Sequence, residues 1–122
     1  MTSKMTASGT ILVADDDHAV RSTLKEILQR EGYDVIEAED GDAALEVLRD
    51  HEVSVVVLDI RMPRRDGIAV LDALEAPPKV LLLSAFSLDT ETRVRLDAKV
   101  FKYLRKPVPP ERLLKAIAEA FV

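Results

Sequence analysis

The sequence contains no cysteine, so neither a disulfide framework nor a thiolate metal site can form in this chain. This absence fits a protein of the reducing cytoplasm, which is the location that we expect. No apolar run approaches the roughly 20 residues of a membrane-spanning helix, and we expect no membrane partner. Residues 1–9 lack the apolar stretch of a signal peptide. We expect residues 1–9 to form a disordered leader without a role of their own.

Basic residues are outnumbered by acidic ones, which gives a formal net charge of −5 and an isoelectric point near 5.0. This balance argues against a direct nucleic-acid partner, because such binding depends on Lys and Arg neutralising phosphates. The two histidines, His18 and His51, have the character of surface residues and show no sign of acting as phosphocarriers. The 122 residues, 48% hydrophobic and 32% charged, predict one packed domain over residues 10–122.

Short β-branched runs alternate with amphipathic segments along the chain. We expect strands at residues 10–14, 33–38, 53–58, 80–83 and 100–104. Helices are expected between Asp17 and Gly32, at 41–51 after an Asp40 cap, around Ile68 to Leu74, and from Pro110 through Phe121. Residues 89–98 have no clean apolar stripe, and a helix is expected there because two parallel strands need a crossover. The pattern predicts an α/β fold, a doubly wound parallel sheet of five strands with five helices on its two faces.

Polar residues follow four of the expected strands. Asp15 and Asp16 follow the first strand, Asp59 the third, Ser84 the fourth and Lys106 the fifth. In parallel sheets the carboxyl ends of the strands meet at one edge, where ligands bind. We therefore expect these side chains to converge in one crevice.

Three converging carboxylates repel one another unless a cation lies among them. The donors are hard oxygens, and no Cys is present and neither His lies within that set. Mg²⁺ is the ion that such a set favours, held by one or two carboxylates and several waters. The sequence thus predicts a Mg²⁺ site as the cofactor site of this protein.

An Asp after a strand can also serve only as a helix cap, and this is the better interpretation of Asp17. Asp59 differs, because Met62-Pro63 and Asp66-Gly67 predict a loop before the next helix. We expect an exposed Asp59 carboxylate that can accept a phosphoryl group, with Lys106 and the Ser84 hydroxyl holding the transferred oxygens. A cis peptide at Lys106-Pro107 would aim the lysine inward.

These residues resemble the receiver domains of bacterial two-component systems over residues 10–122. The resemblance is carried by Ile11-Leu-Val-Ala-Asp-Asp16, Leu58-Asp-Ile-Arg-Met-Pro63 with Asp66-Gly67, Ser84-Ala85 and Tyr103-Leu-Arg-Lys-Pro107. It implies a flavodoxin-like strand order, 2-1-3-4-5, and Asp59 as phosphoacceptor. It also implies direct Mg²⁺ ligation by Asp16, Asp59 and the Arg61 main-chain carbonyl, with Asp15 acting through water. Lys106 would pair with the phosphoryl group.

The resemblance further implies a phosphorylation-activated switch that receives its phosphoryl group from a histidine kinase or a phosphotransfer protein. Ser84 and Tyr103 would be the switch pair, and helix four, strand five and helix five the face that changes. The basic residues of that face either meet an acidic partner or are simply solvated; they are Arg93, Arg95, Lys99 and Lys102. The output would be a separate protein or a covalently linked effector domain. We expect no enzyme activity beyond the domain's own aspartyl phosphorylation and dephosphorylation.

The sequence departs from many relatives in three places. The Gly that often ends helix four is replaced within Asp97-Ala-Lys-Val100, so the end of that helix is expected to differ. Lys102 precedes Tyr103, so the Asp-Asp-Tyr pattern of one class of transcription-factor dimers is missing, although another phosphorylation-dependent homodimer remains open. Arg61 and Phe86 occupy the positions that tune hydrolysis in the family, and a bulky Phe86 is expected to lengthen the phosphorylated lifetime.

Two other function classes compete with this interpretation. Asp15 and Asp17 mimic the paired aspartates of haloacid-dehalogenase-like phosphatases, but the chain is short for a substrate cap and such enzymes would not need Asp59. A receiver-like interaction module that has lost phosphorylation is the second, although every residue that the chemistry requires is present. A stand-alone regulator, a phosphorelay intermediate and a domain of a longer protein all remain open.

Overall fold

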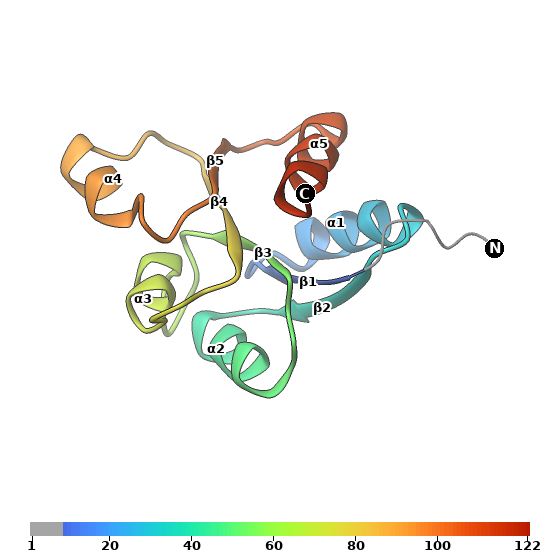
Figure 1. The fold of residues 1–122 in the computed structure, drawn as a ribbon, viewed down its shortest axis with the longest axis horizontal. Coiled ribbons are helices and arrows are strands. Elements are labelled where there is room, and N and C mark those ends of the chain that lie inside the picture. Colours follow the sequence, from blue (N-terminus) through green and yellow to red (C-terminus); the bar gives the residue numbers. More distant parts are fainter. Residues whose placement is uncertain (1–8) are drawn as a thin grey trace.

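The computed structural model describes residues 9–122, so the expected leader lies outside the described residues except for Gly9. The described residues form one parallel sheet of five strands in the order β2-β1-β3-β4-β5, which confirms the expected order (Figure 1). The strands are β1 (Thr10–Ala14), β2 (Asp34–Ala38), β3 (Val55–Asp59), β4 (Lys79–Ser84) and β5 (Lys102–Arg105). The helices are α1 (His18–Arg30), α2 (Gly41–Asp50), α3 (Gly67–Asp72), α4 (Thr90–Leu96) and α5 (Pro110–Ala120).

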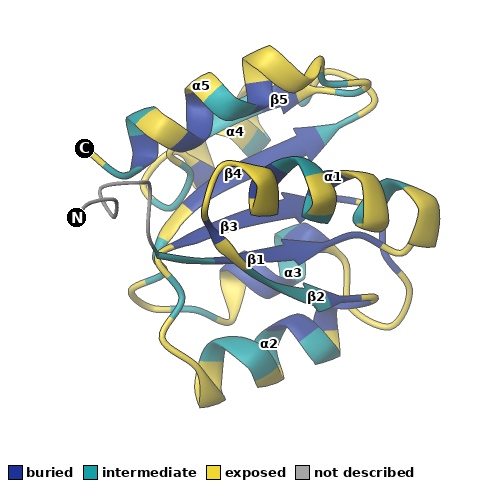
Figure 2. Cartoon of the chain, turned by 90° about the vertical axis from the view of Figure 1, so that its right-hand side faces the viewer, coloured by how far each residue is buried: buried dark blue, intermediate teal, exposed yellow. Residues whose placement is uncertain are grey.

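The helices cover both faces of the sheet, as a doubly wound fold requires. Helices α1 and α5 pack on one face, and α2, α3 and α4 lie on the other (Figure 1). Alternate residues of β1 enter the two cores: Ile11 and Val13 pack with α1 and α5, whereas Leu12 and Ala14 face the other layer. The central strand β3 is buried along its whole length (Figure 2), because neighbouring strands and both helix layers enclose it.

Four helices begin at an aspartate whose side chain accepts backbone N–H groups of the first turn. The expected caps Asp17 and Asp40 are confirmed, and Asp66 and Asp89 cap α3 and α4 in the same way. Pro110 is the first residue of α5, as expected. The crossover expected at residues 89–98 contains a short helix, α4, over Thr90–Leu96.

The expected boundaries were wrong at several strand and helix ends. Val53 and Ser54 lie before β3, and β5 begins at Lys102 instead of Val100. Val100 belongs to the turn after α4, because its N–H donates to the Leu96 carbonyl. Leu74 and Phe121 pack against the cores from positions beyond the ends of α3 and α5. Apolar periodicity indicates which residues are buried. Burial continues past the last backbone hydrogen bond of a helix or strand, so the pattern does not locate the ends of the element.

The loop between β3 and α3 is held against the start of α2. Arg64, at a positive φ of 66°, pairs with the buried Asp40 at 3.1 Å, and Arg65 pairs with Asp42 at 2.9 Å. Gly67 lies directly on the β3 end, because a Cβ there would come within 2.5 Å of the Asp59 carbonyl oxygen. This loop carries Arg61 to the carboxyl edge of the sheet.

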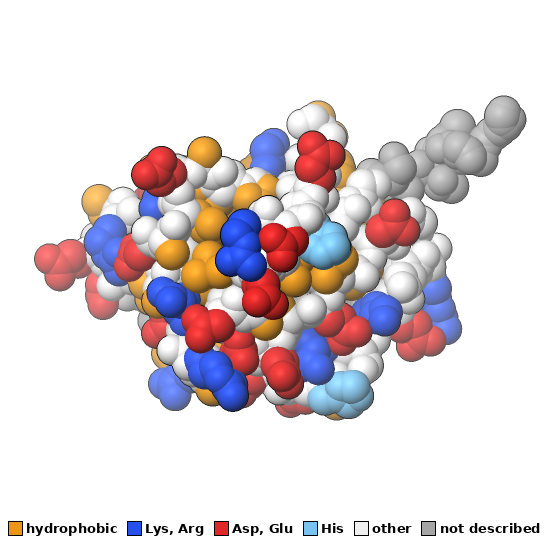
Figure 3. All heavy atoms as spheres, turned by 90° about the horizontal axis from the view of Figure 1, so that it is seen from below, with side chains coloured by type: hydrophobic (Ala, Val, Ile, Leu, Met, Phe, Trp, Pro, Cys, Tyr) orange, Lys and Arg blue, Asp and Glu red, His pale blue; other side chains and the backbone are white. Residues whose placement is uncertain are grey.

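Basic and acidic side chains are interspersed over the face seen from below in Figure 3.

No helix within residues 9–122 is long and apolar enough to cross a membrane.

Candidate functional site

Three aspartates converge at the carboxyl ends of β1 and β3, as the sequence predicted. A carboxylate oxygen from each of Asp15, Asp16 and Asp59 lies within 4.8 Å of the others. Asp15 and Asp59 are buried, whereas Asp16 is exposed. The cluster borders a cavity of about 280 Å³ whose walls also include Arg61, Ser84, Phe86 and Lys106. The topology therefore brings residues far apart in the sequence to one place.

Asp59 lies in the last position of β3, and its side chain is only 8% exposed. The expectation of an exposed carboxylate was wrong, because the neighbouring strands and the loop packed through Gly67 cover the strand end. Burial raises the pKa of Asp59, and the charge of Asp15 raises it further, against the lowering effect of Lys106. An ionised Asp59 is thus costly without an additional cation.

Lys106 reaches across the cluster from the end of β5. Its Nζ lies 3.2 Å from Asp15 Oδ2 and 3.3 Å from Asp59 Oδ1. The Lys106–Pro107 peptide is cis, as the sequence suggested. Burial works against the lysine charge, but the Asp59 and Asp15 carboxylates outweigh it and raise the pKa of Lys106. One ammonium group therefore faces three carboxylates, which leaves net negative charge for a divalent cation.

The Asp15–Asp17 turn is fixed by several hydrogen bonds. Asp15 Oδ1 accepts the Asp17 N–H at 2.9 Å, and the Asp15 N–H donates to the Ala38 carbonyl of β2. The side chain of Asp17 accepts from Ala19 and Val20 at the start of α1. Asp17 is thus a helix cap, which disfavours the Asp15 and Asp17 pair of the phosphatase interpretation.

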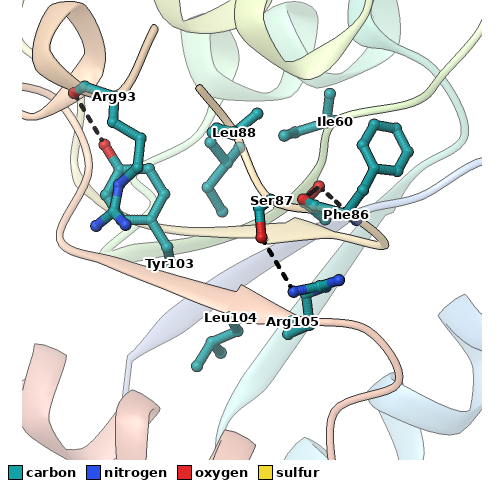
Figure 4. Close-up of a pocket in the computed structure, with 10 residues that line it drawn as sticks. Ile60, Phe86, Ser87, Leu88, Arg93, Tyr103, Leu104 and Arg105 are labelled. Carbon is teal, nitrogen blue, oxygen red and sulfur yellow. Dashed lines mark hydrogen bonds between the residues drawn. The ribbon is translucent and has the colours of Figure 1, made fainter. Parts of the chain in front are cut away.

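Ser84 and Tyr103 both line a second cavity, of about 180 Å³. Its walls also include Ile60, Leu88 and Leu104 (Figure 4). The Ser84 hydroxyl exchanges hydrogen bonds with the backbone of Phe86, donating to its carbonyl and accepting from its N–H. The Tyr103 hydroxyl donates to Asp97 at 2.7 Å, and the Arg93 guanidinium lies 4.3 Å from the ring centroid. Both predicted switch side chains therefore have partners on the chain segment between β4 and β5.

Arg61 and Phe86 cover the acidic cavity from two different loops. The Arg61 guanidinium lies 4.7 Å from the centroid of the Phe86 ring, a cation–π contact. Both residues line the cavity that holds Asp59. The two positions that the resemblance singled out for hydrolysis are thus in contact with each other.

Comparison with known proteins identifies the family. The model of the response regulator receiver domain family matches residues 11–118. The chain belongs to the response-regulator receiver family. The receiver domain is 38% identical over 111 residues to the transcriptional regulatory protein PdtaR of Mycobacterium tuberculosis, covering 88% of this chain and 54% of PdtaR. It is 37% identical to CpxR of Escherichia coli, covering 88% of this chain and 47% of CpxR.

Solved structures agree with this assignment. The receiver domain superimposes on that of Francisella response regulator 1452 with a TM-score of 0.84 and 31% identity, covering 93% of this chain and 96% of the other. The chemotaxis protein CheY4 of Vibrio cholerae gives a TM-score of 0.81 and 27% identity, covering 93% and 99%. The chain spans about half the length of the curated relatives it matches.

The basic residues of the α4-β5-α5 face do not form a free positive surface. Arg95 pairs with Asp72, Lys102 pairs with Glu119, and Lys99 donates to the Leu71 carbonyl. Arg93 lies over the Tyr103 ring. Each of these basic side chains therefore already has a contact within the receiver domain.

Sequence reasoning missed one residue that contacts the site. Arg21 of α1 donates to the Asp15 carbonyl at 2.8 Å. In the sequence Arg21 is one polar residue in an amphipathic helix, so no local signal distinguishes it from Lys25 or Arg30.

Proposed function

We propose that this receiver domain is a phosphorylation-activated switch with Asp59 as its phosphoacceptor. The observation that carries the proposal is the position of Asp59, which lies beside two further aspartates, with its Oδ1 3.3 Å from Lys106 Nζ. Asp59 is a buried carboxylate with two acidic neighbours and one lysine, and the net effect of this arrangement is a raised pKa. Such perturbed groups are concentrated at functional sites.

Asp59, Lys106 and Ser84 would have different roles in the phosphoryl transfer. An Asp59 carboxylate oxygen attacks the phosphorus of the donor, and the P–O or P–N bond to the leaving group breaks as the acyl phosphate forms. Lys106, already at the carboxylate, is placed to pair with the phosphoryl oxygens, and the Ser84 hydroxyl would turn from Phe86 to do the same. No outside oxidant or reductant is needed.

The donor set fits Mg²⁺, because it consists of hard oxygens with an uncompensated negative charge. Asp16, Asp59 and the Arg61 main-chain carbonyl would hold the ion directly, and Asp15 through water. When bound, Mg²⁺ would neutralise charge on the carboxylates and on the incoming phosphoryl group. Asp15 already has hydrogen-bond partners for both oxygens, which favours its indirect role.

The donor would be a histidine kinase or a histidine phosphotransfer protein, and the changed surface would be α4, β5 and α5. The output would lie in a linked effector domain or in a separate partner protein. A homodimer formed on phosphorylation is the alternative output. The domain would catalyse only its own phosphorylation and dephosphorylation.

The test is Mg²⁺-dependent labelling by acetyl phosphate, read by intact mass. Wild type should gain the mass of one phosphoryl group, and Asp59→Asn should gain none. Asp66→Asn is a matched control, because Asp66 is a nearby aspartate that caps α3 and lies outside the acidic cluster. Labelling that survives in Asp59→Asn, or is lost in Asp66→Asn, would count against Asp59 as the acceptor.

A further inference from the structure

Arg21 connects the acidic turn after β1 to strand β2. Its side chain is 12% exposed, and its guanidinium donates to the Asp15 carbonyl at 2.8 Å and to Glu37 Oε1 at 3.1 Å. Glu37 lies in β2, beside the C-terminal end of β1. The planar guanidinium therefore bridges a backbone oxygen of the turn and a carboxylate of the neighbouring strand.

The Asp15 carbonyl belongs to the peptide group that joins Asp15 to Asp16. Because that group is planar, holding its oxygen also sets the direction in which the chain enters Asp16. The other polar groups of Asp15 have their own partners: Ala38 for the N–H, and Asp17 and Lys106 for the carboxylate. Among the described residues no hydrogen bond or ion pair of the Asp16 side chain is present, so its position depends on this backbone.

Lys25 provides a natural comparison on the same helix. Its Nζ lies 3.3 Å from Glu37 Oε2, so Lys25 and Arg21 hold the same carboxylate from two sides. Burial opposes the charge of Glu37, but the two cations outweigh it and lower the pKa of Glu37. Lys25 and Arg21 both contact the Glu37 side chain. Arg21 also donates to the Asp15 carbonyl in the acidic turn, and among the described contacts Lys25 has none there.

We propose that Arg21 is a positioning residue for divalent-cation binding: by bridging the Asp15 carbonyl and Glu37, it holds the Asp15–Asp16 peptide in the orientation that presents the Asp16 carboxylate to the cation. The proposal rests on the proposed function, because it assumes that the acidic cluster binds Mg²⁺. Groups that orient metal ligands commonly change metal affinity by about 10- to 100-fold when removed.

The sign of the effect separates positioning from simple electrostatics. Arg21 is a cation near three carboxylates, so removing its charge alone should strengthen Mg²⁺ binding. Loss of positioning should weaken it. A weaker affinity after removal of a nearby positive charge is therefore opposite to what charge alone predicts.

The experiment is a titration of the whole chain with MgCl₂ at constant ionic strength, followed by amide NMR shifts. We expect Arg21→Met to bind Mg²⁺ about tenfold more weakly than wild type, and Lys25→Met to bind as tightly as wild type or more tightly. Acetyl phosphate labelling of Arg21→Met should recover nearly to the wild-type rate at saturating Mg²⁺, because the reacting groups are unchanged.

Arg21→Lys keeps the charge but replaces the bridging guanidinium with a single ammonium group. It should also bind Mg²⁺ more weakly than wild type, and it carries the test alone if Arg21→Met does not fold. Wild-type or tighter affinity in the folded variants would overturn the positioning role. If wild type itself showed no Mg²⁺ binding, the proposed function would fail instead.

Discussion

The hydroxyl of Tyr103 donates a 2.7 Å hydrogen bond to Asp97, the residue that directly follows α4. The Arg93 guanidinium, one turn earlier in the chain, lies over the tyrosine ring, and the Arg93 carbonyl lies 3.4 Å from the same hydroxyl. The segment at the end of α4 thus fixes the hydroxyl of the predicted switch aromatic, which lines the 180 Å³ cavity (Figure 4).

Removing Asp97 should favour the inward orientation of Tyr103. One hydrogen bond contributes about 0.5–1.5 kcal/mol, so Asp97→Ala should raise the affinity for beryllium fluoride, a phosphoryl analogue, by about 2- to 10-fold. Asp72→Ala is the matched control, because it breaks the Arg95 ion pair of α4 without touching Tyr103. Equal affinities in wild type and Asp97→Ala would show that this contact does not bias the switch.

Alkaline pH should weaken the fold through Tyr103. Burial and the Asp97 carboxylate raise the pKa of Tyr103 to about 12, above the ordinary value of 10.0. The neutral phenol is therefore favoured in the folded state, so its contribution is complete below pH 10 and is lost as the pH rises towards 12. Urea unfolding at pH 9 and pH 11 should show a smaller decline in the free energy of unfolding for Tyr103→Phe than for wild type. Equal declines would contradict this account.

The ionised Asp59 should destabilise the metal-free domain at neutral pH. Its pKa is raised by burial and by Asp15, so the charged form that dominates at pH 7 is the disfavoured one in the fold. We expect Asp59→Asn to raise the free energy of unfolding on the order of 1 kcal/mol without Mg²⁺. Adding MgCl₂ should stabilise wild type more than the variant. A variant less stable than wild type without Mg²⁺ would refute the argument.

Phe86 should slow hydrolysis of the phosphorylated form by shielding it from water. Phe86→Ala removes the ring that lies against Arg61 in the lining of the acidic cavity, so the lifetime should shorten several-fold, roughly 1 kcal/mol in the barrier. Phe101→Ala is a matched control, because Phe101 is similarly exposed and contacts Lys79 in the same way, away from Asp59. The measurement is decay of the phosphorylated mass after the donor is removed. An unchanged lifetime in Phe86→Ala would remove the shielding role.

Much of the fold follows from local pattern. The run Val55–Leu58 is apolar on both sides, which only a central strand covered by two helix layers can bury. Asp17 and Asp40 mark helix starts, because a carboxylate before an amphipathic segment satisfies free N–H groups. Errors were confined to ends such as Val53 and Val100, where burial continues past the hydrogen-bonded element.

The sequence predicts which residues form the candidate site, but it does not predict that Asp59 is buried. Asp15, Asp59 and Lys106 were chosen because each follows a strand, and parallel topology brings such ends together. The burial of Asp59 depends on how closely Gly67 packs on its backbone, which is a contact between two segments. The loop pattern at Met62-Pro63 does not indicate how closely Gly67 packs on the Asp59 backbone.

The order of elements, the strand-end chemistry and the resemblance to receiver domains could all be predicted from the sequence, because periodicity, caps and motif spacing are properties of neighbouring residues. Three contacts became apparent only in the folded structure: Arg21 with Asp15, Asp97 with Tyr103, and Phe86 with Arg61. Each of these pairs joins residues from different elements or turns. Whether two such groups meet depends on how the elements pack in space, and local sequence does not encode those distances.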